Sequence, residues 1–344
     1  MSDALGIALM CGGYYFGAGL AMCLGYHRVL SHRSLLLPKW LERFLVTLGL
    51  PAGTPVQWAG NHRFHHAHAD RRQDPHSPLD GFWHAHNGWY IGRKDALTCI
   101  LYALAGPLRV LFDGWHRPRT NQEHCHLAPE VAADPWYRFV SRRGPYLVLA
   151  IAHVAFFFGG AFALFGAPGV VALWLTLVVV FNLGDAIDSV AHLVGTMPYG
   201  GPDRARNHWV MAMLTLGDGW HANHHRFPWS ARHGLEPRQL DWTWGVIRTL
   251  ERVGLARSVR VPTREQIRAA RAEAAACRRP PSCRRCPPRA TTSSPSWARR
   301  PTTRAIPTRG GPSTRIAACR STRRPRRRSC STRARSRGAS CCPC

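Results

Sequence analysis

The C-terminal part of the chain lacks the residues from which a hydrophobic core is built. Residues 277–344 contain 19 Arg and no Asp or Glu, and from Arg278 onward there is no Leu, Val, Phe or Met. Such a segment cannot bury enough apolar surface to offset its loss of conformational entropy, so we expect a disordered tail. Its abrupt change of composition also fits out-of-frame translation of GC-rich DNA, which resequencing near the Ala276 codon would test.

This tail accounts for most of the extreme charge and cysteine content of the chain. Removing its 19 arginines lowers the formal charge from +27 to +8, and the tail also holds 8 of the 12 cysteines. The remaining four, Cys11, Cys23, Cys99 and Cys125, give no disulfide framework. A nucleic-acid-binding function inferred from net charge would require residues 277–344. We expect little effect of their deletion and no nucleic-acid partner.

The body, residues 1–262, contains three apolar runs of membrane-spanning length, at 4–24, 146–165 and 170–187. About 20 apolar residues cross a hydrocarbon core, so these runs predict an all-α integral membrane bundle with three clear spans. Buried helices of a large soluble protein are the alternative. The first run lacks the features of a signal peptide, so we expect it in the mature protein. A short helical extension is predicted at 263–276.

The last two runs predict a hairpin with its turn at residues 165–169. Two crossings return the chain to the side that it left, so His192 emerges beside His27. Residues 41–58 are also apolar, but a crossing there would separate His27 from His62. The segment is interrupted by Pro51, Gly53 and Pro55, and we predict an interfacial or partly buried helix. Excess Lys and Arg on the shared side predict that it is cytoplasmic.

Eight of the 19 histidines fall into three boxes. One is the pair His27-x4-His32, and the triplets are His62-x2-His65-His66 and His221-x2-His224-His225. On an α-helix, positions i, i+3 and i+4 share a face, so each triplet presents three imidazoles toward one centre. The pair is about 140° apart on a helix, so its members approach from different sides or straddle a helix end. A surface cluster is the alternative for any one triplet.

With His192 the boxes supply nine nitrogen ligands, too many for one metal. Imidazole suits iron, copper, zinc and nickel, so ligand type does not select the metal. The Glu-x-x-His pattern of soluble di-iron bundles is absent. Asp70, Asp74 and Asp218 lie close to the boxes in sequence and are candidates to orient the rings.

At these residues the sequence resembles the membrane fatty acyl desaturases, specifically the stearoyl-CoA Δ9 type. The resemblance covers about residues 25–262. Its motifs are Gly-Tyr-His27-Arg-Val-Leu-Ser-His32, Trp58-Ala-Gly-Asn-His62-Arg-Phe-His65-His66, Asp74-Pro-His76, Gly81-Phe-Trp, His86-Asn-Gly-Trp89 and Gly217-Asp-Gly-Trp-His221-Ala-Asn-His224-His225-Arg-Phe-Pro228. The resemblance implies two iron ions held in a cytoplasmic helical cap by His27, His32, His62, His65, His66, His192, His221, His224 and His225.

The implied reaction is O2-dependent insertion of a cis double bond, at Δ9, into a saturated acyl-CoA chain. An acyl-lipid desaturase or a fatty acyl hydroxylase on the same scaffold is the alternative, and a zinc-binding scaffold without catalysis is a third reading. No haem-binding or ferredoxin domain is visible. Electrons are therefore expected from a separate ferredoxin, or from a b5-type cytochrome with its reductase. The expected location is a bacterial inner membrane.

Two features depart from the family pattern. Asp188 stands where the family has Asn; it can still accept a hydrogen bond from a metal-bound water. One span precedes the first box, whereas the family has two and therefore four in all. Arg93 and Lys94 match the basic pair that meets coenzyme A phosphates, and the candidates to line the acyl tunnel are Trp58 and Trp220.

Overall fold

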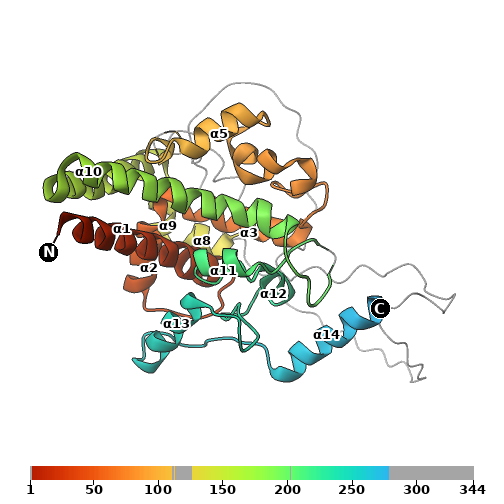
Figure 1. Cartoon of the computed structure of the whole chain (residues 1–344). Helices are drawn as coiled ribbons and strands as arrows, with labels where there is room; N and C mark the ends of the chain where they lie inside the picture. Colours follow the sequence, from red (N-terminus) through yellow and green to blue (C-terminus); the bar gives the residue numbers. More distant parts are fainter. Residues whose placement is uncertain (1, 111, 113–125, 202, 279–344) are drawn as a thin grey trace, which may run out of the picture. The chain divides into compact units, whose positions relative to one another are not determined.

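The computed structural model describes residues 2–110, 112, 126–201 and 203–278 (Figure 1). Residues 1–275 form one compact unit and 276–344 a second, of which only the last residues of one helix are described. The regular elements among the described residues are all helical, which confirms the predicted helical class. Cys125 and the predicted tail lie outside the described residues, apart from Cys277 and Arg278.

The first apolar run forms α1 (Asp3–Leu20), whose N-terminus is capped by the Ser2 hydroxyl. It continues without a break into the π-helix η1 (Ala21–Ser31). In a π-helix each N–H bonds to the carbonyl five residues earlier, a winding that is frequent at functional sites. The His32 N–H donates to the His27 carbonyl oxygen over 3.1 Å in this way. The helix is therefore longer than the predicted run and ends inside the first histidine box.

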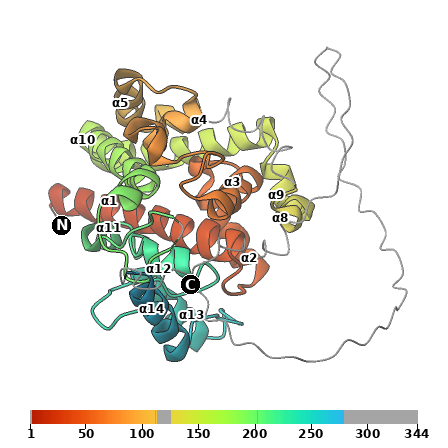
Figure 2. The same cartoon turned by 90° about the vertical axis from the view of Figure 1, so that its right-hand side faces the viewer.

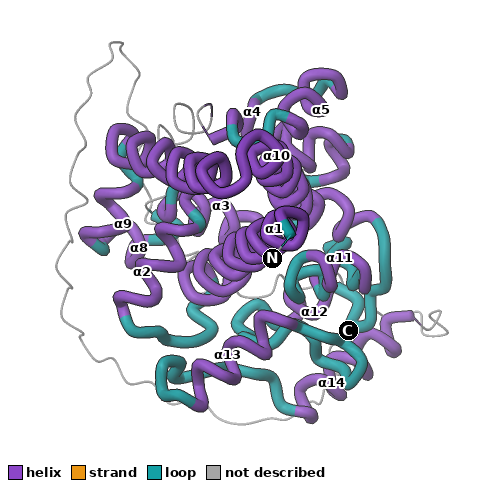
Figure 3. Tube along the Cα trace, turned by 60° about the vertical axis from the view of Figure 1, so that its left-hand side comes forward, coloured by secondary structure: helices purple, strands orange, loops and turns teal. Residues whose placement is uncertain are grey.

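The predicted hairpin is present within α10 (Arg143–Leu193). Gly166 interrupts the helix with φ 59° and ψ −150°, a conformation open almost only to glycine, and it lies in the predicted turn. The two limbs fold back on each other and pack against α1 (Figure 3). Ala161 of the first limb and Leu173 and Leu177 of the second share a buried cluster with Tyr14.

The segment with three helix breakers, for which we predicted one interfacial or partly buried helix, forms two helices instead, because Pro51, Gly53 and Pro55 end one helix before the next begins. The helix α2 (Lys39–Leu48) ends before the 3₁₀ turn η2 (Leu50–Ala52), and α3 (Pro55–His68) begins at a proline. Proline suits this first position because its missing N–H has no intrahelical partner there. The second histidine box lies on α3, which packs beside η1 (Figure 2).

Shorter helices complete the unit around these long ones. Between α3 and α10 lie η3 (Pro78–Asp80), η4 (His84–Gly88), α4 (Trp89–Ile91), α5 (Ala96–Leu104), α8 (Pro129–Ala133) and α9 (Pro135–Val140). After α10 come α11 (Trp209–Leu214), α12 (His221–Arg226), α13 (Trp242–Arg252) and α14 (Arg264–Arg278). The predicted extension is thus α14, and its Ala270 packs against Tyr199, Phe227 and Leu235.

Two of the described helices, 3–31 and 143–193, are long and apolar enough to cross a membrane. Only 22% and 17% of their most apolar windows are buried, unlike the core helices of a soluble protein. Large side chains such as Leu9, Phe156, Phe162, Leu164 and Leu175 are exposed along them. Such exposed apolar surface is typical of helices that contact lipid or another protein.

Candidate metal centre

The first histidine box is shaped by the π-helix. Because the hydrogen bonds of η1 span five residues, His32 lies about one turn beyond His27, and the two rings project to the same side with centroids 5.1 Å apart. His32 is the C-cap of the helix, so the pair does straddle a helix end. Arg63 of α3 donates to the carbonyl oxygens of Leu30 and Ser31, which have no intrahelical partner.

The two triplets lie on α3 and on the short helix α12, and the single histidine lies at the end of α10. The structure brings all nine imidazoles together in two groups. Within each group the candidate ligand nitrogens lie within 4.8 Å of one another. The first group has five members, His27, His32, His62, His66 and His224, and the second has four, His65, His192, His221 and His225.

The nitrogens within each group face one another. Nε2 of His224 lies 3.0 Å from Nε2 of His27 and 2.8 Å from Nε2 of His66. Nε2 of His192 lies 3.0 Å from Nε2 of His221 in the second group. When each ring carries its proton on Nδ1, the converging Nε2 lone pairs repel each other, and a cation between them removes that repulsion. The arrangement therefore suits a metal ion in each group.

Charge is also suited to metal binding. Burial lowers the pKa of these rings well below the ordinary imidazole value, and neighbouring imidazoles act in the same direction. The rings affected are His32, His62, His66, His221, His224 and His225. They stay neutral near pH 7, and the neutral ring is the form that offers a lone pair to a metal.

Carboxylates fix several of the rings from behind. The Nδ1 atoms of His27, His65 and His192 lie 2.8, 3.0 and 2.9 Å from oxygens of Asp218, Asp74 and Asp70, respectively. A carboxylate accepts and the ring nitrogen donates, so the proton sits on Nδ1 and Nε2 keeps its lone pair. These are the three acids suggested by the sequence.

The charged form of these acids is favoured. Burial acts to raise the pKa of Asp74, but the hydrogen bond from His65, electrostatic attraction to His65 and His76 and the hydrogen bond from the Asp70 N–H together outweigh it and hold that pKa below its usual range. For Asp218, burial is outweighed by His27 and Arg28, which keep the pKa well below the usual range. Both acids are therefore ionised acceptors at neutral pH.

Sequence reasoning missed a fourth carboxylate, Asp203, whose Oδ2 lies 3.2 Å from Nδ1 of His225. It comes from the irregular segment between α10 and α11, 22 residues before its partner, with no motif around it. We expect Asp203→Asn to weaken metal binding by about 10-fold to 100-fold, because the amide supports the ring less strongly. Titration of the purified protein with Fe²⁺ measures this, and unchanged affinity would contradict the assigned role.

A buried ion network supports the first group. Arg28 is fully buried, and its Nη2 lies 3.3 Å from Asp218 and 3.1 Å from Asp241. Asp241 caps α13 by accepting from the Trp244 N–H, and it also accepts from the His233 N–H. The network therefore ties the first box to the C-terminal helices.

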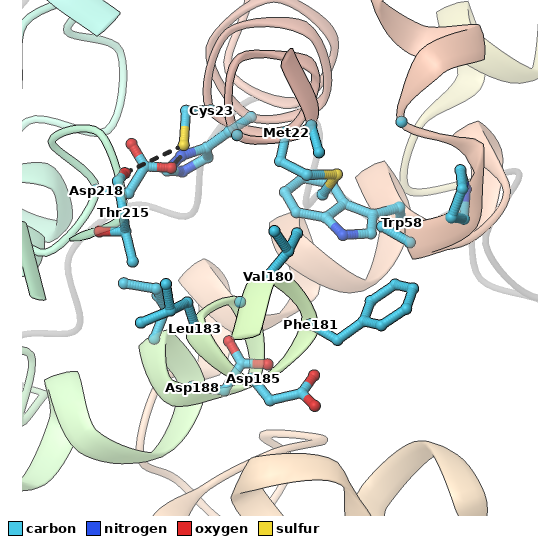
Figure 4. A pocket seen from close by; sticks show the side chains of 18 of the residues that line it. Met22, Cys23, Trp58, Val180, Phe181, Leu183, Asp185, Asp188, Thr215 and Asp218 are labelled. Atoms are coloured by element: carbon cyan, nitrogen blue, oxygen red, sulfur yellow. Dashed lines mark hydrogen bonds and ion pairs between the residues drawn. The ribbon is translucent and has the colours of Figure 1, made fainter. Parts of the chain in front are cut away.

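A cavity of about 220 Å³ opens beside the first group. Figure 4 shows Met22, Trp58, Val180 and Phe181 around it. His27 and His62 line one part of its wall, so an occupant lies next to the candidate centre. The cavity then extends along α1 and the second limb of α10, past Tyr14, Ala18 and Leu177.

The other predicted site residues are placed as follows. Trp58 lines the cavity and stacks on His62, with ring centroids 5.0 Å apart. Asp188 lines it as well, 3.8 Å from Nδ1 of His76. Trp220 lies outside the lining, and its indole N–H donates to the Leu240 carbonyl oxygen. Arg93 and Lys94 are exposed, just after Trp89 and Tyr90 of the cavity wall.

The nine imidazoles thus form two groups that could each hold a metal ion, beside a largely apolar cavity. Residues 4–243 match the fatty acid desaturase family. The chain belongs to that family.

Three relatives illustrate its range. The chain is 39% identical over 255 residues to a probable chloroplastic lipid desaturase of Arabidopsis thaliana, covering 73% of this chain and 62% of that protein. It is 35% identical over 266 residues to an sn-1 stearoyl-lipid 9-desaturase of Anabaena variabilis, covering 76% of this chain and 86% of that protein. It is 38% identical over 244 residues to an acyl-CoA C20 Δ5-desaturase of Anemone leveillei, covering 70% of this chain and 69% of that protein. The chain thus spans less than two thirds of the first relative.

Proposed function

We propose that residues 1–262 form an O2-dependent desaturase that inserts a cis double bond at Δ9 into a saturated fatty acyl chain. The observation that carries the proposal is the pair of histidine groups beside an apolar cavity. The first group would hold one iron and the second group the other, with Asp188 contributing to the second through a water. Two irons held there would use O2 and two external electrons to supply an oxidant able to take two hydrogens from adjacent unactivated methylenes, with O2 reduced to water.

The protein's own residues supply position and protection. The apolar wall formed by Met22, Val180 and Phe181 takes up the acyl chain and keeps water away from the reacting methylenes. Trp58 narrows the cavity at His62 and holds the chain against the first group. Asp218 and Asp74 keep the rings of His27 and His65 in one orientation.

Acyl-CoA is the proposed form of the substrate. The exposed Arg93 and Lys94 lie three and four residues after the cavity-lining Tyr90, where they can meet the phosphates of coenzyme A. An acyl chain esterified in a membrane lipid is the second candidate, since two of the relatives above are named for lipid substrates.

The surroundings of the enzyme follow from the same proposal. The exposed apolar faces of α1 and α10 would lie in the lipid of a bacterial inner membrane, with both histidine groups at its cytoplasmic face. α1 and the two limbs of α10 would then be three spans. O2 and a separate electron donor, a ferredoxin or a b5-type cytochrome with its reductase, are the remaining proposed partners.

The proposal is tested by product analysis. The full chain, reconstituted with iron and an electron donor, is given stearoyl-CoA or vesicles of a stearoyl lipid under air. We expect a product lacking two hydrogens, with a cis double bond at carbon 9, and faster turnover of the thioester. A product that gains oxygen would instead establish the hydroxylase. No modified product from either substrate would refute the proposal.

A further inference from the structure

The wall of the cavity carries a charged cluster that neither the histidine boxes nor the metal groups explain. It consists of Tyr90 on α4, Arg109 after α5 and Asp185 on α10. The Arg109 guanidinium lies 2.9 Å from Asp185, and it also donates to the Tyr90 hydroxyl. The Tyr90 hydroxyl in turn donates to Asp185 over 3.0 Å. All three residues line the cavity, beside the apolar Phe181.

The cluster is held rigidly. Arg109 is only 2% exposed, and the centre of its guanidinium lies 4.5 Å from the ring centroid of Tyr102 and 4.6 Å from that of Phe181. Aromatic faces attract a cation at such distances, so the guanidinium is fixed between two rings. A hydrogen-bond donor held in this way loses little entropy when it binds a ligand.

The charge balance of the cluster selects the kind of ligand. One guanidinium and one carboxylate cancel, so the site has no net charge to attract an anion such as a free fatty acid. A guanidinium offers several N–H dipoles, and in a site without net charge these favour a neutral acceptor. An acyl chain attached to a carrier has one such group, the carbonyl oxygen of its thioester or ester.

The position of the cluster fits that group. Asp185 lies seven residues before His192 on α10, about 10 Å along the helix axis. Leu177 lies on the same limb, about 22 Å from His192. The cluster is therefore set back from His192 by several methylene lengths. The part of the cavity at Tyr14, Ala18 and Leu177 remains for the methyl end of the acyl chain.

We propose that Tyr90, Arg109 and Asp185 form an anchor for the carbonyl of the acyl ester, which sets the position of the double bond by measuring from the carboxyl end. The inference rests on the proposed function. Arg109 donates to the carbonyl oxygen, while Asp185 and Tyr90 hold the guanidinium in place. The part of the acyl chain between the carbonyl and the first histidine group then has one fixed length. The part between that group and the methyl end can vary.

A chain-length series tests this. Wild type and Arg109→Gln and Tyr90→Phe variants are given saturated C16, C18 and C20 acyl-CoA, and in parallel the same acyl chains in lipid vesicles. We expect wild type to place the double bond at one distance from the carbonyl in every chain. In both variants we expect KM to rise about tenfold, with the product spread over neighbouring positions. If the variants change KM and product position more with acyl-CoA, the anchor holds a thioester. If they do so more with lipid vesicles, it holds a lipid ester.

Tyr90→Phe removes only a hydroxyl and guards against a folding defect in the arginine variant. The matched control is Arg43→Gln, because Arg43 also pairs with an acid, Asp134 at 3.3 Å, but lies outside the cavity lining. It should retain a single product. Unchanged product positions and KM in the folded Arg109 and Tyr90 variants would overturn the anchor while leaving the desaturase proposal intact. An inactive wild type would instead remove the proposed function.

Discussion

Replacing His224 by alanine is expected to reduce desaturase product by more than about 100-fold, beyond the loss typical for a supporting partner of a ligand. His224 is fully buried, and its Nε2 lies within 3.0 Å of those of both His27 and His66. Its removal leaves four imidazoles in the first group and an empty volume at their centre. Bound iron should fall from two per chain toward one, measured by elemental analysis of purified protein.

The control for this variant lies on the same helix as the second box. His68 is the last residue of α3, and its Nδ1 contacts the Phe64 carbonyl oxygen rather than another imidazole. It belongs to neither group. His68→Ala should keep its iron and its product, and full activity of His224→Ala beside it would contradict the assigned centre.

Replacing Arg28 by leucine is expected to destabilise the fold by about 3–5 kcal/mol, because it leaves buried carboxylates without their cation. Both partners are buried, Asp218 with 11% and Asp241 with 1% of its side chain exposed. The midpoint of thermal unfolding of detergent-solubilised protein should fall by about 10 °C. An exposed ion pair on α13 serves as the control for this buried network.

Arg248 and Glu251 pair on the surface of α13, where water screens their charges. Arg248→Ala should therefore change stability by no more than about 1 kcal/mol. Equal midpoints for the Arg28 and Arg248 variants would show that the buried network contributes no more than a surface pair. Arg28→Lys keeps the charge but loses the planar guanidinium, whose Nη2 contacts both carboxylates while its Nε contacts His233, so its stability should lie between the two.

Local patterns in the sequence predicted much of this fold. Three apolar runs gave α1 and the two limbs of α10, and the turn at residues 165–169 was identified from its glycine and proline. Pro51 and Pro55 were identified as interruptions, but we expected one helix where the chain forms α2 and α3. These features depend on neighbours in the chain, where backbone stereochemistry and hydrophobicity act directly.

The candidate site could be predicted only in part. The i, i+3, i+4 spacing indicated that each triplet faces one centre, but the division into groups of five and four depends on how α3, α10 and α12 pack. Asp203 reaches His225 from an irregular segment, and no local pattern indicates that contact. The cluster of Tyr90, Arg109 and Asp185 was also not predictable from local sequence, because Arg109 and Asp185 are 76 residues apart and pair only through tertiary packing.

The π-helix has a further consequence for how the first box can vary. A π turn holds one residue more than an α turn, so the five-residue spacing of His27 and His32 and the wide winding of η1 depend on each other. Deleting one residue between them would let the segment rewind as an α-helix, with the two imidazoles four apart and still on one face. The five-residue spacing of His27 and His32 thus matches the π-helical winding of η1. An insertion or deletion between them would shift the residues after it relative to α3 and α12.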